Sequence, residues 1–273
     1  MTIKCQSFFN YLLYFCKREL SRFFKLKIVT FMKHSSFNFD TFVAMRIVLV
    51  VSFMLICLSA MAFNSCADKK DESMTSDEHE YVDLGLSSGT LWATCNVGAS
   101  NPDACGCYFS WGETSPKGSY KASNYKFGGY CQMAKYCIHS LFGYNDFTDD
   151  KTELDPEDDA AYVNWGPSWR MPTTEQLREL VDNCMWTWTT EYGVYGQQGT
   201  GPNGNVIFFP FESYMDDDQV VFPGLFGCYW SRTLSSRRSD SADYLHIGSR
   251  GVSCCDQKRY LGLPVRAVRM IQN

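Results

Sequence analysis

An apolar stretch that ends at a cysteine constrains this chain more than any other feature, because it decides which residues are left to fold. Arg46 precedes a largely apolar run, 47–58, and small residues then lead to Cys66. This layout predicts a secretory signal peptide over residues 44–65 that is cleaved in front of Cys66. A retained membrane span is the alternative, because the apolar run is close to the lower limit of ~17–25 residues for a bilayer-spanning helix.

The residues around this cleavage point resemble those of bacterial lipoproteins, in which the new N-terminal cysteine carries acyl chains. The resemblance implies that Cys66 is lipid-modified and anchors the chain in the outer membrane. Acidic residues such as Asp68 and Asp71 further resemble the surface-export signals of Bacteroidetes lipoproteins, which implies a position on the cell surface. Residues 66–79 are polar, have little to bury, and are expected to form a tether.

The residues in front of the signal, 1–43, are aromatic and basic and lack the turn-punctuated pattern of a globular domain. A signal peptide belongs near the N-terminus. We therefore interpret this segment as over-extended translation or an unstructured region, with Met32 or Met45 as the true start. The alternative is an amphipathic segment that lies on a membrane surface.

The 207 residues after Cys66 suffice for one domain with a substantial core, which we place at 80–273. This part of the chain carries 17 basic and 28 acidic residues, a net charge of −11. An acidic surface repels phosphate backbones, so nucleic acid is not an expected partner.

Cysteines are frequent in this part of the chain, and an exported protein is able to form disulfides. Their odd number leaves at least one thiol free or paired between chains. The spacing of Cys105 and Cys107, and of Cys254 and Cys255, does not match that of zinc sites, so we predict no metal and no cofactor. The nine are Cys95, Cys105, Cys107, Cys131, Cys137, Cys184, Cys228, Cys254 and Cys255.

The clearest secondary-structure signal is an amphipathic helix at about 173–184. Thr173 and Gln176 form a capping box, and apolar residues at Leu177, Leu180 and Cys184 recur at helical spacing. Loop-like composition dominates 113–152, which is unusually long for a structureless loop. Short strands are predicted at 80–86, 90–97, 108–112, 206–211, 227–231, 243–247 and 263–271. Few helices and many strands indicate an α+β domain with long loops.

An acidic run at 154–161 follows the long loop. Asp155 suits an N-cap and Pro156 the first helical position, so a short capped helix is the favoured interpretation. Calcium ligation by Asp149, Asp150 and Asp155 is the alternative, since calcium prefers carboxylate oxygens in irregular loops.

Several ordered motifs make the domain similar to the Fibrobacter succinogenes major paralogous domain family, which is abundant in Bacteroidetes lipoproteins. The resemblance implies a C-type-lectin-like fold related to formylglycine-generating enzymes. No hydrolase elbow or glycosidase carboxylate pair accompanies it, so we do not expect an enzyme. The motifs are YVDLGLSSGTLWATCNVGA (81–99), YFSWGET (108–114), EDDAA (157–161), WGPSWRMPTTEQLREL (165–180), GPNGN (201–205), GCYWS (227–231) and PVRAVR (264–269).

The segment 232–262 resembles, by its position, the variable region of C-type-lectin-fold proteins that retroelements diversify. Tyr, Ser, Gly and Arg also dominate natural binding loops. The resemblance implies a ligand-binding surface, and the alternative is an ordinary polar end with solvated charges. The predicted binding residues are Arg232, Arg237, Arg238, Asp243, Tyr244, His246, Arg250, Asp256 and Tyr260.

Tryptophans and cysteines supply further expectations. Trp92, Trp165, Trp169 and Trp230 are predicted to be core residues, and one of Trp186 and Trp188 is expected to be exposed. A disulfide between Cys95 and Cys184 is predicted because both lie in the framework motifs of the resemblance.

Together these patterns predict a lipid-anchored cell-envelope protein with a non-enzymatic binding or adhesion domain for an unknown protein or glycan. A structural component of the envelope or of a fimbria-like assembly is the alternative. An exposed apolar or aromatic patch at 228–260 would favour binding, and a long unpaired edge strand would favour assembly.

Overall fold

A computed structural model describes residues 79–190 and 193–270 of the chain. The predicted leader (1–43), signal peptide (44–65), lipid-modified Cys66 and nearly all of the tether (66–79) lie outside these residues. Within the described part, no helix is long and apolar enough to cross a membrane.

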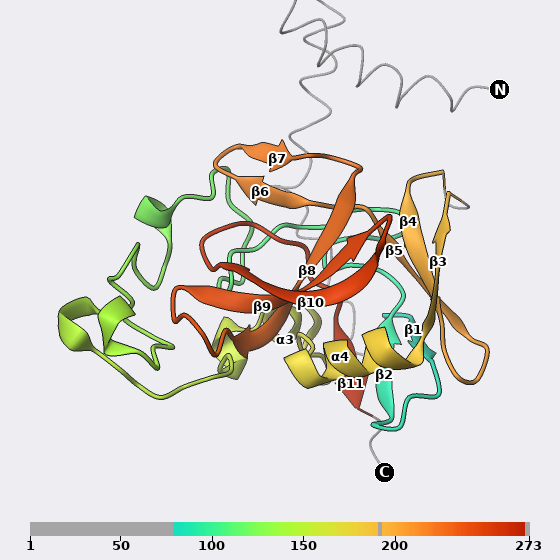
Figure 1. The fold of residues 1–273 in the computed structure, drawn as a ribbon, viewed down its shortest axis with the longest axis horizontal. Helices are drawn as coiled ribbons and strands as arrows, with labels where there is room; N and C mark the ends of the chain where they lie inside the picture. Colours follow the sequence, from blue (N-terminus) through green and yellow to red (C-terminus); the bar gives the residue numbers. More distant parts are fainter. Residues whose placement is uncertain (1–78, 191–192, 271–273) are drawn as a thin grey trace, which may run out of the picture. The chain divides into compact units, whose positions relative to one another are not determined.

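Antiparallel strands dominate the described residues, which contain eleven strands and two α-helices (Figure 1). Four 3-10 helices of three residues each lie at 122–124, 140–142, 144–146 and 156–158. The strands are β1 (Tyr81–Asp83), β2 (Thr90–Ala93), β3 (Met185–Thr189), β4 (Gly196–Thr200), β5 (Val206–Pro210), β6 (Tyr214–Asp216), β7 (Gln219–Val221), β8 (Phe226–Leu234), β9 (Ser241–Gly248), β10 (Gly251–Lys258) and β11 (Val268–Met270), and the helices are α3 (Ala160–Trp165) and α4 (Thr174–Asn183).

The strands form three three-stranded sheets and one hairpin. Their orders are β1-β2-β11, β3-β4-β5 and β10-β9-β8, with β6 paired to β7. In the first sheet β2 pairs with both β1 and β11, so the start and end of the described chain lie in one sheet. The predicted strand at 108–112 is reduced to a single bridge between Phe109 and Leu263.

The predicted fold class, an α+β domain of C-type-lectin-like type, is wrong. The described residues are mainly β, because segments without an alternating apolar pattern also form strands. β4 has the sequence GQQGT, and β6 and β7 belong to a hairpin rich in aspartate. Tertiary pairing overrides the weak strand propensity of these segments.

The predicted amphipathic helix is confirmed as α4. Thr173 Oγ1 accepts a hydrogen bond from the Gln176 amide, and the Gln176 side chain accepts one from the Thr173 amide. Leu177 and Leu180 are buried on its inner face. The local capping and periodicity signals therefore agree with the final packing.

The acidic run forms two short helices instead of one. A 3-10 helix at 156–158 precedes α3, and the N-cap of α3 is Asp159. Its carboxylate accepts hydrogen bonds from the amides of Ala161 and Tyr162, whereas Asp155 makes no capping hydrogen bond. The N-cap of the α-helix therefore lies four residues after the predicted Asp155, whose carboxylate forms ion pairs with Lys135 and Lys151.

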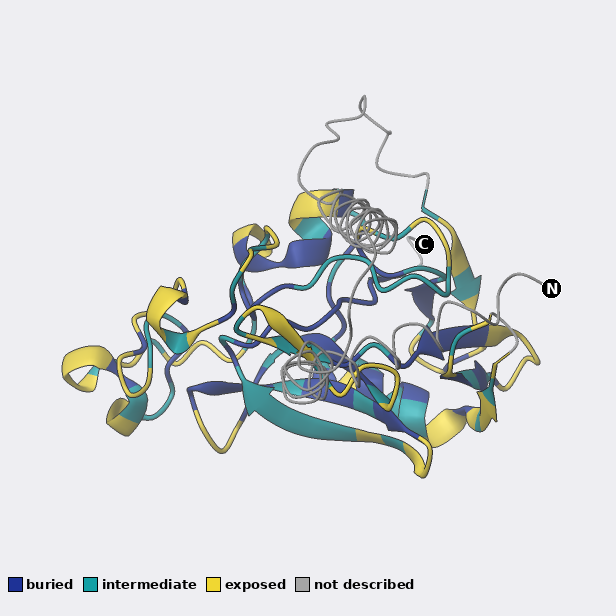
Figure 2. Ribbon diagram, turned by 90° about the horizontal axis from the view of Figure 1, so that it is seen from above, coloured by how far each residue is buried: buried dark blue, intermediate teal, exposed yellow. Residues whose placement is uncertain are grey.

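Two hydrophobic clusters make up the core, and the β8-β9-β10 sheet contributes to both. Trp230 and Tyr244 belong to one cluster, while Tyr229 and Leu245 belong to the other, which also contains Leu177 and Leu180 of α4. The predictions that Trp92, Trp165, Trp169 and Trp230 are core residues are confirmed. Exposed residues concentrate in peripheral loops and short helices (Figure 2).

Candidate functional site

The predicted binding residues are spread along the β10-β9-β8 sheet and do not form one site. Arg250 lies in the turn that precedes β10, and Tyr260 follows the opposite end of the strand. The eight residues of β10 span about 25 Å at the usual rise of a strand. A single small ligand therefore cannot touch both ends.

The predicted binding residues in the middle of this sheet pack against other side chains. Tyr244 is only 8% exposed, and its ring packs 6.4 Å from that of Trp230. His246 is half-buried against Phe226, at 5.5 Å between ring centroids, and burial lowers its pKa. Both residues lie on β9, the central strand of the sheet. Their spacing of two residues therefore reflects packing within the sheet and not contact with a ligand.

Asp243 and Arg232 are also occupied by protein partners. The Thr174 hydroxyl donates to Asp243 Oδ2 at 2.9 Å, and burial raises the pKa of this carboxyl. Arg232 forms an ion pair with Glu153 at 2.9 Å. These contacts tie the sheet to α4 and to the end of the long loop.

At the far end of β10, Tyr260 and Tyr130 wall a shallow pocket. Their hydroxyl oxygens lie 3.1 Å apart and their rings meet edge to face at 5.8 Å. Tyr130 is 61% exposed and so presents its ring to solvent. We call this the Tyr130–Tyr260 pocket; it is lined by Tyr125, Gly128, Gly129, Tyr130, Met133, Asp240, Lys258, Arg259 and Tyr260.

A cluster of paired charges borders the pocket. Asp240 is buried and accepts from Arg238 at 3.0 Å and from Lys258 at 2.5 Å. Burial raises the pKa of Asp240, but these hydrogen bonds outweigh burial and lower the pKa below its ordinary value. Arg237 pairs with Asp256 at 2.5 Å beside them and keeps most of its side chain in solvent.

Arg259 builds the floor of the pocket. Its guanidinium is fully buried and donates to the Tyr125 hydroxyl and to the carbonyls of Lys135, Tyr136 and Ser239, at 2.8–3.0 Å. The cation also lies 4.7 Å from the ring centroid of Trp111. Arg259, which lies between Lys258 and Tyr260, therefore connects the long loop to the end of β10.

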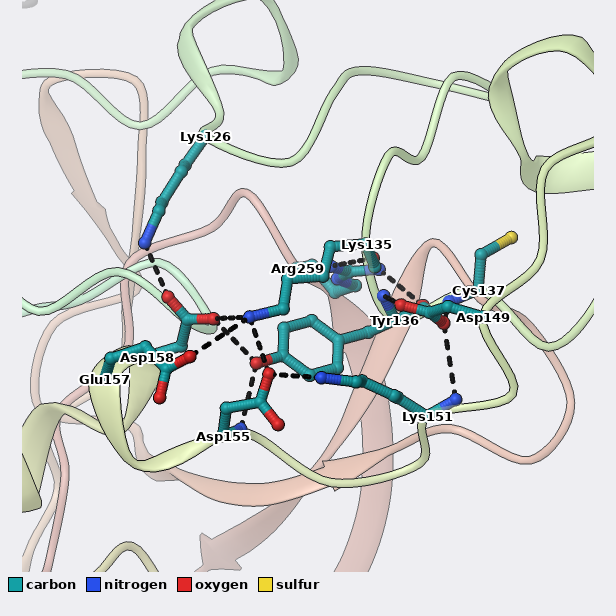
Figure 3. A network of polar contacts seen from close by, with 10 residues as sticks. All are labelled: Lys126, Lys135, Tyr136, Cys137, Asp149, Lys151, Asp155, Glu157, Asp158 and Arg259. Atoms are coloured by element: carbon teal, nitrogen blue, oxygen red, sulfur yellow. Dashed lines mark hydrogen bonds and ion pairs between the residues drawn. The ribbon is translucent and has the colours of Figure 1, made fainter.

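The loop is held from its other side by a lysine–aspartate network (Figure 3). Asp158, almost fully buried, receives hydrogen bonds from Lys126, Lys135 and the Tyr136 hydroxyl, each at 2.6 Å. Lys135 also reaches Asp155 at 2.6 Å. Because Tyr125, Gly128, Tyr130 and Met133 all line the pocket, this network fixes the segment that forms its outer wall.

Sequence reasoning found Tyr260 and the neighbouring Arg237 and Arg238 but missed Tyr130 and Lys258. The Gly128-Gly129-Tyr130 turn was a usable signal, since paired glycines beside an aromatic residue allow close backbone approach. The local sequence does not indicate that this turn lies at the end of β10. The two segments are held together by Arg259, which is more than 100 residues away from the turn in the chain.

The predicted Cys95–Cys184 disulfide is not formed in the structure, where both residues are free thiols. Cys184 caps the C-terminus of α4 and packs in a hydrophobic cluster, whereas the Cys95 thiol contacts the Thr94 hydroxyl. Among the described residues, no group of His, Cys, Asp and Glu is arranged to hold a metal ion. Asp149 instead accepts amides of the long loop.

Comparison of the chain with protein-family models, with curated proteins and with solved structures found no match. The geometry itself describes a shallow pocket with phenol walls, a charged border and a floor fixed by a buried guanidinium.

Proposed function

We propose that this chain is a lipid-anchored protein of the bacterial outer membrane, exposed at the cell surface, whose domain binds a protein or glycan without catalysis. The proposal includes membership of the Fibrobacter succinogenes major paralogous domain family and a Bacteroidetes source. The observation that carries the binding role is the Tyr130–Tyr260 pocket, in which the long loop and the predicted C-terminal segment meet.

The chemistry of the pocket suits recognition. Tyrosine offers a large rigid contact area at low entropic cost together with a hydroxyl for hydrogen bonding. The buried Arg259 and the lysine–aspartate network hold both walls in place before a ligand arrives. Preorganisation of this kind reduces the entropy lost on binding.

The binding role is tested by screening the full chain, in detergent micelles, against immobilised glycans and cell-surface proteins. We expect at least one class of ligand to be retained by the wild-type chain and lost by the Tyr130→Ala/Tyr260→Ala double variant. Tyr81→Ala is the matched control, since Tyr81 is a comparably exposed tyrosine on β1. Retention of every ligand by the double variant would contradict the proposal.

The anchor is tested separately by metabolic labelling with a radioactive fatty acid. We expect label in the wild-type chain and none in Cys66→Ala, which would accumulate with its signal peptide attached. Equal labelling of both chains would remove Cys66 as the lipid site.

A second candidate function, assembly through strand addition, is favoured by the free edge of β10. Arg259 donates its amide to Asp240 and extends the β9 ladder, so Val252, Cys254 and Asp256 direct their backbone groups away from β9. No described segment pairs with these groups. The exposed patch at 228–260 that would favour binding is not present, because no large apolar side chain in this range is strongly exposed.

Strand addition is tested by light scattering of the full chain with Cys254→Pro, which removes an outward amide, against Cys254→Ala. If assembly uses this edge, the wild-type chain and the alanine variant form higher-order species and the proline variant does not. Identical masses for all three chains would exclude the edge as an assembly surface.

A further inference from the structure

Trp188 and Tyr195 form an exposed aromatic pair on the β3–β4 hairpin. Their rings are stacked, with centroids 5.6 Å apart and planes 29° apart, and the residues are 48% and 52% exposed. Trp186, two residues before Trp188, instead packs on Phe209 in the core. The prediction that one of these two tryptophans is exposed is therefore confirmed, and a large aromatic surface is left in water.

The turn that carries Arg250 is fixed beside this hairpin. Trp188 lies opposite Gln197 in the β3–β4 register. Gln197 is buried, and its Nε2 donates to the carbonyl of Gly248 at 3.0 Å. Because side chains of directly opposed residues share one face of a sheet, the aromatic pair and the Gly248–Gly251 turn lie on the same side, and the turn adjoins β4 in Figure 1.

Arg250 provides a cation without a counter-charge. It is exposed, and no carboxylate among the described residues pairs with it, whereas Arg237 and Arg238 are both paired. The chain beyond Cys66 is strongly acidic. An unpaired guanidinium in the turn that Gln197 ties to this hairpin therefore offers a charge-assisted bond to an incoming anion.

We propose that Trp188, Tyr195 and Arg250 form a second binding surface, which takes an acidic saccharide. The apolar C–H face of a sugar ring packs on the exposed aromatic rings, and its carboxylate pairs with the guanidinium. A peptide fits less well, because its anchoring side chains need a well-packed pocket, and the pocket described above lies at the opposite end of β10. This surface does not depend on the function proposed for the Tyr130–Tyr260 pocket.

The test is a calorimetric titration of the full chain in detergent micelles with trigalacturonic acid and, separately, with its methyl ester. We expect the acid to bind at least tenfold more tightly than the ester. Arg250→Gln should weaken binding of the acid about tenfold and leave the ester unchanged, since a lost charged hydrogen bond costs about 1.4 kcal/mol or more. Trp188→Ala and Tyr195→Ala should weaken binding of both sugars.

Two controls separate this surface from nonspecific attraction. Arg178→Gln removes an exposed cation of α4, and Met185→Ala removes an exposed apolar side chain of β3. Both should bind like the wild-type chain. If Trp188→Ala fails to fold, the turn variant Arg250→Gln decides the question alone. Absence of binding to the acid, equal loss in Arg178→Gln, or unchanged binding in Arg250→Gln would each overturn the proposal.

Discussion

At the scale of single residues, Arg259 has the largest structural role near the pocket. Burial of a guanidinium is tolerated only when its donors find acceptors, and here one hydroxyl and three backbone carbonyls supply them. Three of those acceptors belong to the loop segment 125–136. The residue therefore replaces regular secondary structure as the organiser of this loop.

Replacing Arg259 by methionine should destabilise the domain by about 3 kcal/mol or more. The change keeps much of the apolar volume but leaves three buried carbonyls without donors, each at a cost of about 1–3 kcal/mol. Urea unfolding followed by tryptophan fluorescence measures the loss, with Arg237→Met as the exposed control. A loss below about 1 kcal/mol, within the range of ordinary substitutions, would show that the loop does not depend on Arg259.

The lysine–aspartate network should make stability fall in acid. Lys135 and Lys151 lower the pKa of Asp155 to about 2, below its ordinary value of about 3.9. A lowered folded-state pKa contributes stability that is complete above the unfolded value and is lost as the pH falls from about 4 towards 2. Melting temperatures between pH 5 and pH 2 should therefore decline less steeply in Asp155→Asn. Parallel declines would contradict this assignment.

At the scale of elements, local signals predicted helices better than strands. α4 was found because its capping box and its apolar stripe lie within twelve consecutive residues. β4 and β10 were missed because their sequences, GQQGT and GVSCCDQK, are polar or contain glycine and become strands by pairing with their neighbours along the chain. β3 was also missed, although its sequence, MWTWT, alternates large apolar residues with threonine as a strand does. The N-cap of α3 was misplaced because Asp155 and Asp159 are equally suitable in sequence, and only tertiary contacts distinguish them.

The two helix caps should differ in their contribution to stability. Thr173→Ala should cost about 1 kcal/mol, as is usual for a cap near the surface. Asp159 is fully buried and accepts amides from Ala161, Tyr162 and Met171, so Asp159→Ala should cost at least twice as much. Chemical denaturation of both variants measures the difference, and equal losses would refute the ranking.

At the scale of the whole molecule, the sequence predicted a binding segment but did not predict the geometry of that segment. Residues that are close in the chain, such as Arg250 and Tyr260, are separated by the full length of β10 because a strand is extended. Residues far apart in the chain, Tyr130 and Tyr260, are brought together by Arg259. The resemblance identified framework tryptophans correctly, yet it implied a fold class that the predominance of antiparallel strands contradicts.

The central claim, that the Tyr130–Tyr260 pocket binds a ligand, is tested most directly by affinity. The strongest ligand from the screen should be titrated into the full wild-type chain, Tyr130→Ala, Tyr260→Ala and the control Tyr81→Ala. We predict at least a tenfold loss of affinity in each pocket variant and none in the control. Affinities that are equal in all four chains would contradict the account.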